Sequence, residues 1–296
     1  MKKKLTVIMS IYSEDEYMIK LSIDSILNQT YKGFDFIIVN DNPYNSNINK
    51  LLTGYEDSRV IVINNESNIG LTRSLNKALK LVKTKYIARM DADDIAESYR
   101  FEKQINILEN KDIDICGSNV YVINSNGDIT GKHVYPESSS HIKAKMFFRS
   151  CICHPSVMFT KKFIDALDGY DDKMVKAQDY ELWTRAIIND YEFYNIQECL
   201  LKYRMHDNNI STKNIEGQNN ASFNIKIKLM NYFTKSDKVK ECVLFMDGYN
   251  SKINILELFI FYLELLFFVL RKKKNINFLF FFVSFFKRSL FRWYKK

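Results

Sequence analysis

The sequence predicts an α/β protein with an open, mostly parallel sheet, helices on both faces and a helical C-terminal extension. Over the first 97 residues, short apolar runs rich in β-branched residues alternate with segments of helical periodicity. Turn-forming or acidic residues follow directly after two of these runs, as at Asn40-Asp41-Asn42-Pro43. The alternation stops near residue 212, after which Asn, Lys and Phe dominate. We therefore expect one α/β domain over 1–212 and a helical region over 213–296.

Each predicted element rests on a pattern of its own. Apolar residues recur every three to four positions over 19–27 and 75–82, which predicts two helices that each bury one face. Buried parallel strands are expected at 5–9, 34–39, 60–63 and 86–90. The second half is less regular, with helices expected near 99–110 and 179–189 and strands near 113–123, 156–160 and 199–203.

Charge and cysteine content exclude several classes of protein. The formal charge of the 296 residues is +8, but residues 271–296 carry nine Lys and Arg and no acid, so the rest of the chain is nearly neutral. A nucleic-acid-binding groove needs positive charge along its whole length, and we expect no nucleic acid partner. Five cysteines are an odd number in a long chain, which favours reduced thiols in a cytosolic protein. No long apolar stretch follows Met1, so no secretory signal is expected.

The sharpest local feature is an acidic loop, Asp91-Ala-Asp93-Asp94, placed directly after a predicted strand. In open α/β sheets, ligands bind beyond the carboxyl ends of the strands. Three crowded carboxylates repel one another unless a cation lies between them, and hard oxygen ligands suit Mg²⁺ or Mn²⁺. The alternative is an acidic loop that only caps the next helix.

A second acid, Asp41, ends an earlier strand and should lie at the same edge of the sheet. It could accept hydrogen bonds from a base or a ribose, or it could simply form the turn before Pro43. The first loop, Ser10-Ile-Tyr-Ser, has neither the glycine fingerprint of a dinucleotide fold nor a Walker lysine. It also lacks the glycine-rich first turn expected of a sugar-phosphate nucleotidyltransferase, an enzyme class that would share the sheet and the metal.

Six motifs occur in order along the first hundred residues: Val7-Ile-Met-Ser-Ile-Tyr-Ser, Ser25-Ile-Leu-Asn-Gln-Thr-Tyr, Ile37-Ile-Val-Asn-Asp, Asn68-Ile-Gly-Leu-Thr-Arg-Ser-Leu-Asn-Lys, Tyr86-Ile-Ala-Arg-Met-Asp-Ala-Asp-Asp and Arg100-Phe-Glu-Lys-Gln. Together they resemble the family 2 glycosyltransferases of the GT-A fold, particularly bacterial members that build surface polysaccharides. The resemblance covers about residues 4–212. It implies a Rossmann-like mixed sheet with a donor half over about 1–97 and an acceptor half over about 98–212.

The resemblance implies a donor site in the first half. Asp91 and Asp93 match the family's DXD motif, which binds Mn²⁺ or Mg²⁺ and a nucleotide-sugar, with Asp94 close by. Asp41 matches the acid that contacts the nucleotide base. The remaining donor-side positions implied by the match are Ser10 and Tyr12 in the first loop, Arg73 facing the diphosphate, and His206 with Arg204 in the closing segment. One departure is Asn40, which stands where many members have an acid.

The resemblance places the acceptor half around Gln178-Asp179 and His154. Direct displacement at the anomeric carbon needs a carboxylate that takes the proton of the acceptor hydroxyl, and the match assigns that role to Asp179 with inversion of configuration. From the residues alone, Asp179 could equally cap the helix that follows. Cys151-Ile-Cys153-His154 has a short spacing seen in zinc sites, but no second cysteine pair follows, so zinc is not expected.

The C-terminal region combines apolar, aromatic and basic residues. Residues 253–270 are apolar-rich, but as a helix they would be about 27 Å long, borderline for crossing a bilayer. Glu257 and Glu264 fall on one face, which favours an amphipathic helix. Phe, Trp and Tyr interleaved with cations over 276–296 suit a peripheral anchor on an anionic membrane surface. A hairpin dipping into the bilayer, packing on a partner, and packing on the chain's own domain are the alternatives.

Taken together, the sequence predicts a glycosyltransferase at the cytoplasmic face of the cell membrane, bound through residues 253–296. The expected donor is a nucleotide-sugar, of the UDP-sugar kind, and the expected acceptor is a glycan or a lipid-linked oligosaccharide. A membrane-associated scaffold without catalysis and a sugar-phosphate nucleotidyltransferase are the competing hypotheses.

Overall fold

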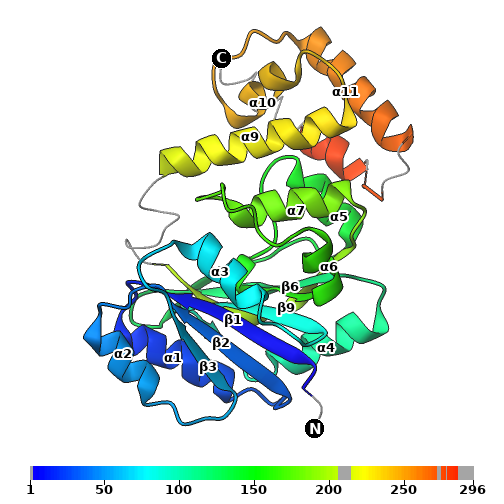
Figure 1. Cartoon of the computed structure of the whole chain (residues 1–296). Coiled ribbons are helices and arrows are strands. Elements are labelled where there is room, and N and C mark those ends of the chain that lie inside the picture. Colours follow the sequence, from blue (N-terminus) through cyan, green and yellow to red (C-terminus); the bar gives the residue numbers. More distant parts are fainter. Residues whose placement is uncertain (1–2, 206–214, 272–274, 278, 286–296) are drawn as a thin grey trace.

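The computed structural model describes residues 3–205, 215–271, 275–277 and 279–285. In these residues the strands form one mixed sheet in the order β3-β2-β1-β4-β8-β6-β9-β5, with β7 paired to β6 (Figure 1). The strands are β1 (Leu5–Ile11), β2 (Phe34–Asn40), β3 (Val60–Asn64), β4 (Tyr86–Asp91), β5 (Ile95–Ala96), β6 (Ile115–Ile123), β7 (Ile129–His133), β8 (Met158–Thr160) and β9 (Phe193–Arg204).

The first four strands form the parallel half of the sheet. β1 lies between β2 and β4, and all these pairings are parallel, as is that of β2 with β3. The register places Ser10 opposite Val39 on one side and opposite Asp91 on the other. The carboxyl ends of these strands therefore meet at one edge, which is where the acidic loop begins.

Helices cover both faces of the sheet and enclose two separate cores. α1 (Glu16–Leu27), α2 (Ser46–Thr53) and α4 (Arg100–Asn110) bury their apolar residues on one face. On the other face lie α3 (Leu71–Leu79), α5 (Ser139–Met146), α6 (Lys161–Ala166) and α7 (Gln178–Ile188). The fold is thus the α/β class expected from the sequence, with one helix layer on each side of the sheet.

The C-terminal helices pack onto the second of these faces. α9 (Ile215–Phe233), α10 (Val239–Asp247) and α11 (Ile255–Arg271) share a continuous core with α5 and α7, and Figure 1 shows α9 lying across them. Phe233 lies 5.4 Å from Phe147 between ring centroids, and Phe281 of the last described helical turns lies 5.1 Å from the same ring. The extension is therefore helical, and it packs on its own domain.

No described residue covers the opposite face of α11. Large apolar side chains recur on it at helical spacing, and the exposed ones are Leu256, Phe259, Ile260, Leu263, Phe267 and Leu270. Among the described residues, no helix is long and apolar enough to cross a membrane. The predicted domain boundary at 212 falls outside the described residues, so the division into 1–212 and 213–296 stays a prediction.

Sequence patterns located the main strands within a few residues and missed several smaller elements. β7 is fully exposed, so it shows no apolar alternation that would predict a strand. β5 has only two residues, and α2, α5 and α6 are short helices of six to eight residues. β9 runs twelve residues, longer than expected, because polar residues over 195–198 interrupt its apolar pattern.

Candidate active site

The acidic loop forms a compact cluster of carboxylates at the carboxyl end of β4. One side-chain oxygen from each of Asp91, Asp93 and Asp94 lies within 4.8 Å of the others, with Asp91 and Asp93 half-buried and Asp94 buried. The parallel register brings this cluster beside the end of β1, where Ser10 is buried opposite Asp91. The sequence-based expectation that these three acids lie together at the sheet edge is confirmed.

The end of β9 closes the cluster from the other side. The backbone N–H of Arg204 donates to Oδ1 of Asp94 at 2.8 Å, and Nε of Arg204 donates to the carbonyl of Asp93 at 2.7 Å. Burial raises the pKa of Asp94 well above its usual range, and the neighbouring charges of Asp93 and Asp91 raise it further. Each carboxylate thus disfavours ionisation of the others, and a cation between them would relieve this repulsion.

The chemistry of this donor set fits a hard divalent cation. Oδ2 of Asp94 is buried and has no hydrogen-bond partner among the described residues. An orphaned carboxylate oxygen beside two more carboxylates is a natural set of ligands for Mg²⁺ or Mn²⁺. The three acids of the loop could therefore hold such an ion.

Arg89 is a buried cation that sequence reasoning missed. It is 2% exposed and forms an ion pair with Asp91 through Nη2, while its Nε and Nη1 have no partner among the described residues. Arg89 and Asp91 lie two residues apart on β4, so their side chains point to the same face. The sequence did contain a signal for this ion pair, because Arg89 interrupts an apolar strand two positions before Asp91.

Asp41 lies buried at the end of β2 and holds the turn that starts α3. Its Oδ1 accepts hydrogen bonds from Asn65 Nδ2 at 2.7 Å and from the N–H of Ile69 at 2.8 Å, and its Oδ2 accepts one from the N–H of Gly70 at 2.8 Å. The carboxylate therefore sets where α3 begins. The contact of Asp41 with a nucleotide base stays a prediction.

The hydrogen bonds of Asn40 explain why this position carries an amide and not an acid. Nδ2 of Asn40 donates to side-chain oxygens of Asn49 at 2.8 Å and Asn64 at 3.0 Å, and Oδ1 accepts from the N–H of Asn42 at 3.0 Å. A carboxylate could not donate to Asn49 or Asn64. This departure from the family pattern is thus compensated by neighbouring amides.

The other donor-side residues occupy the same edge of the sheet. Tyr12 is 45% exposed in the loop after β1, and its carbonyl accepts from Asn42 Nδ2 at 2.8 Å. Arg73 is exposed in the first turns of α3. His206, the remaining donor-side prediction, lies outside the described residues.

Glu14 adds a further acid that the motifs did not reveal. Its Oε2 accepts hydrogen bonds from the N–H groups of Tyr12 at 2.8 Å and Ser13 at 3.1 Å. Burial raises the pKa of Glu14, and the charge of Asp91 raises it further, which places this carboxyl within electrostatic reach of the acidic loop. The first loop thus folds around a carboxylate that faces the cluster.

Asp179 lies in the first turn of α7, after Ala177 in a left-handed conformation with φ of 53°. Burial raises the pKa of the Asp179 carboxyl, its own helix N–H groups and Arg89 lower it, and Asp91 raises it. Asp179 therefore lies close enough to Arg89 and Asp91 to sense both charges. Gln178 precedes it and is half-buried. The predicted base thus senses the charge of the acidic loop, although 88 positions separate Asp91 and Asp179 in the numbering.

His154 lies beside this group as a buried, neutral imidazole. Its Nε2 is 2.7 Å from the hydroxyl of Tyr170, and its ring packs edge-on against Tyr170 and Trp183. Burial lowers the pKa of His154 well below its usual range, and the positive charge of Arg89 lowers it further. Tyr170 was not anticipated from the sequence, because only the fold brings it to His154. All five cysteines are free thiols, so Cys151 and Cys153, which precede His154, form no disulfide.

A cluster of acids beyond the ends of parallel strands, faced by a carboxylate from a helix of the second half, defines an enzyme of the GT-A class. The family model for glycosyl transferase family 2 matches residues 6–167, more than half of the chain. The chain belongs to this family and is a glycosyltransferase.

Relatives and solved structures agree with that assignment. The chain is 42% identical over 238 residues to an uncharacterized glycosyltransferase of Methanocaldococcus jannaschii, covering 79% of this chain and 78% of that one. It is 35% identical over 228 residues to the O-antigen biosynthesis glycosyltransferase WbnJ of Escherichia coli, covering 75% and 87%. The structure of S. aureus TarS 1-349 in complex with UDP-GlcNAc superimposes with a TM-score of 0.64 at 13% identity, covering 97% and 89%, which supports the fold.

Proposed function

We propose that this glycosyltransferase moves a sugar from a UDP-sugar to a glycan or lipid-linked oligosaccharide, with inversion, in the synthesis of a cell-surface polysaccharide. The observation that carries the proposal is the cluster of Asp91, Asp93 and Asp94 carboxylates at the carboxyl ends of the parallel strands. Relatives with this family's sequence include enzymes of O-antigen and amylovoran biosynthesis. A related Escherichia coli enzyme, 28% identical over 209 residues, is named as a glucosyltransferase that uses UDP-Glc and a lipid-diphosphate acceptor.

The donor is assigned to the edge formed by β1, β2 and β4. Asp91 and Asp93 would hold Mn²⁺ or Mg²⁺, which when bound neutralises charge on the departing diphosphate. Ser10, Tyr12 and Asp41 would line the nucleotide pocket, and Arg73 at the start of α3 would face the diphosphate. His206 would close the same site from the segment after β9.

The proposed chemistry is a single displacement at the anomeric carbon. The oxygen of the acceptor hydroxyl forms the new glycosidic bond while the bond from the anomeric carbon to the diphosphate breaks. Asp179 accepts the hydroxyl proton, and the nucleoside diphosphate leaves on the opposite face, so the configuration inverts. His154 and Gln178 would border the acceptor, His154 as a neutral group held by Tyr170.

The acceptor would be met at the cytoplasmic face of the membrane. The exposed apolar face of α11 supports this part of the proposal, because its opposite face is already buried against the domain. Residues 271–296 supply nine cations and no acid, which complements an anionic lipid surface. A bound chain would bring the transfer site to a lipid-linked acceptor.

Calorimetric titration of the full-length protein with UDP tests the donor site. We expect UDP to bind in the presence of Mn²⁺, binding to be lost in EDTA, and binding to be lost in Asp93→Ala. Asn106→Asp, on the far helix α4, is the control and should bind UDP as the wild type does. A folded wild-type protein that binds neither UDP nor other nucleoside diphosphates would overturn the proposal and favour a scaffold without catalysis.

A further inference from the structure

The segment between α6 and α7 has no regular secondary structure over 167–177, yet it carries Tyr170 and leads directly into Asp179. It contains three left-handed residues, Asp168 with φ of 56°, Gly169 with φ of 72° and Ala177 with φ of 53°. The two non-glycine residues adopt this conformation at a cost of roughly 1 kcal/mol each. Contacts with the surrounding helices must therefore hold the segment in place.

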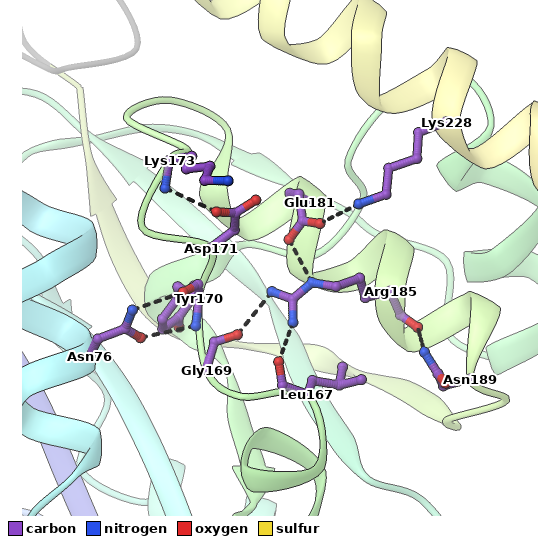
Figure 2. A network of polar contacts seen from close by, with 10 residues as sticks. All are labelled: Asn76, Leu167, Gly169, Tyr170, Asp171, Lys173, Glu181, Arg185, Asn189 and Lys228. Carbon is purple, nitrogen blue, oxygen red and sulfur yellow. Dashed lines mark hydrogen bonds and ion pairs between the residues drawn. The ribbon is translucent and has the colours of Figure 1, made fainter.

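One side chain of α3 grips both backbone groups of Tyr170. The N–H of Tyr170 donates to Oδ1 of Asn76 at 2.9 Å, and Nδ2 of Asn76 donates to the carbonyl of Tyr170 at 2.8 Å. The same Nδ2 also donates to Oδ1 of Asp172 at 2.6 Å, beside its contact with Tyr170 that is drawn in Figure 2. The Asn76 amide thus satisfies both backbone groups of Tyr170, as a neighbouring strand would do in a sheet.

Thr72 and Arg185 also bind the backbone of this segment. We call the hydrogen bonds from Asn76, Thr72 and Arg185 to the backbone of 167–177 the clamp. Thr72, one turn earlier on α3, donates its hydroxyl to the carbonyl of Met174 at 2.8 Å. From α7, the guanidinium of Arg185 donates to the carbonyls of Leu167 and of Gly169, the latter at 2.9 Å, while Glu181 accepts from its Nε at 2.7 Å (Figure 2). The segment is held from the donor half by α3 and from the acceptor half by α7.

Gly169 packs closely against Asn76, while an open cavity borders the same segment. A Cβ on Gly169 would lie 2.7 Å from Oδ1 of Asn76, so the amide reaches Tyr170 only because residue 169 has no side chain. Beside it, a polar cavity of about 640 Å³ is lined by Asn76, Tyr170, Asp172 and Arg185 among others, and does not include the acidic loop. The segment is closely packed against Asn76 and borders open space at the cavity. The hydrogen bonds from Asn76, Thr72 and Arg185 therefore restrain the segment beside the cavity.

The start of α3 is fixed by the candidate donor site. Asp41 holds the N–H groups of Ile69 and Gly70, so its position sets that of α3. Two turns later, Asn76 sets the position of Tyr170, and the hydroxyl of Tyr170 holds His154. A continuous series of hydrogen bonds and one helix therefore runs from the donor side to the acceptor side.

We propose that Asn76 is a positioning residue that fixes the 167–177 segment and thereby the acceptor-side group of Tyr170, His154 and Asp179. Asn76 touches neither donor nor acceptor in this assignment and acts through Tyr170. The inference rests on the proposed function for its catalytic readout, while its structural readout is independent of that function.

The experiment uses the full chain with Asn76→Asp, Asp172→Asn and the two together. Asn76→Asp keeps the acceptor for the N–H of Tyr170, loses the donor to its carbonyl and sets a charge against Asp172. We expect hydrogen exchange over 167–177 to increase at least tenfold, kcat for sugar transfer from a UDP-sugar to fall about tenfold, and the affinity for UDP to stay within twofold. Adding Asp172→Asn removes the charge repulsion and should recover most of kcat.

The matched control is Asn106→Asp on α4, which should change none of these quantities. Unchanged exchange in Asn76→Asp would overturn the clamp, whether or not the enzyme turns over. Faster exchange with unchanged kcat would overturn the positioning role, and so would a fall in UDP affinity equal to the fall in kcat. A wild type that binds no nucleotide would instead overturn the proposed function, and the exchange data would still decide the clamp.

Discussion

The hydroxyl of Tyr170 lies 2.7 Å from Nε2 of His154, and both side chains are buried, with the imidazole packed against Trp183 of α7. Burial lowers the pKa of His154 well below its usual range, and burial raises the pKa of Tyr170. Both groups are therefore neutral at neutral pH, and the hydrogen bond joins an uncharged imidazole to an uncharged phenol. In the proposed function, this neutral polar pair would border the acceptor without adding a charge there.

Acid should destabilise the protein through His154. Its pKa is lowered in the folded state, so the unfolded chain binds the proton more readily below about pH 6.5. Stability should be full above that pH and fall as the pH drops, by up to about 1.4 kcal/mol per pH unit. His154→Gln should flatten this dependence when unfolding free energies are measured between pH 7.5 and 5. The exposed His133→Gln should leave the slope as in the wild type, and an unchanged slope in His154→Gln would contradict a buried neutral imidazole.

Replacing the proposed base should remove turnover without removing donor binding. Asp179→Asn keeps the size of the side chain at the start of α7 and loses the proton acceptor, so kcat should fall by ~100-fold or more. UDP affinity should stay close to that of the wild type, because the proposed function assigns Asp179 to the acceptor. In the wild type, burial raises the pKa of Asp179, so the acid limb of the kcat profile should lie above the range of an ordinary aspartate. Full turnover in Asp179→Asn would remove it from catalysis.

Much of this site could be predicted from the sequence because its parts are local. The acidic loop and Asp41 each follow a buried strand directly, and parallel strands bring such ends to one edge. Asp179 could be placed only through the family resemblance, since nothing local shows which acid meets the sheet edge.

Tyr170 and Asn76 could not be assigned roles from the sequence, because their roles depend on a contact between distant segments. Tyr170 joins the site through Asn76, 94 positions away. Arg89 lies in an apolar strand where its partner, the residue two positions on, becomes evident only when the face of the sheet is known. Likewise, the apolar C-terminal sequence does not show which face of α11 the domain covers.

Removing the buried cation should make the acidic loop depend on metal for stability. Arg89→Gln leaves the carboxylate of Asp91 without its counter-ion, at about 2 kcal/mol, less than for a fully enclosed pair because Asp91 is 31% exposed. Thermal unfolding in EDTA should show this loss, and Mn²⁺ should raise the melting temperature more in the variant than in the wild type. Arg59→Gln, which breaks a pair with Asp57 away from the site, should show no greater response to Mn²⁺ than the wild type. An equal response in Arg89→Gln would separate Arg89 from the metal site.

A methyl group at position 169 should disturb the clamp on Tyr170. Gly169 has φ of 72° and no room for a Cβ beside Asn76, so Gly169→Ala should cost about 2 kcal/mol of unfolding free energy and lower kcat. Gly131→Ala is the matched control, since nothing lies within 4 Å of a Cβ at that position. Denaturant unfolding of both variants gives the comparison. Equal stability of the two would mean that the segment adapts without loss.

The uncovered face of α11 should bind vesicles of anionic lipid. Leu256, Leu263 and Phe267 are 64%, 45% and 60% exposed on one side of the helix, so replacing all three by Ser removes apolar surface without opening the core. Three side chains of this size should account for on the order of a 100-fold change in vesicle affinity. Co-sedimentation with vesicles of anionic lipid should therefore fall sharply in the triple variant, and high salt should weaken wild-type binding because residues 271–296 are basic. Leu81→Ser and Ile129→Ser, exposed apolar positions elsewhere, should sediment as the wild type does. Undiminished binding of the triple variant would assign membrane attachment to another surface.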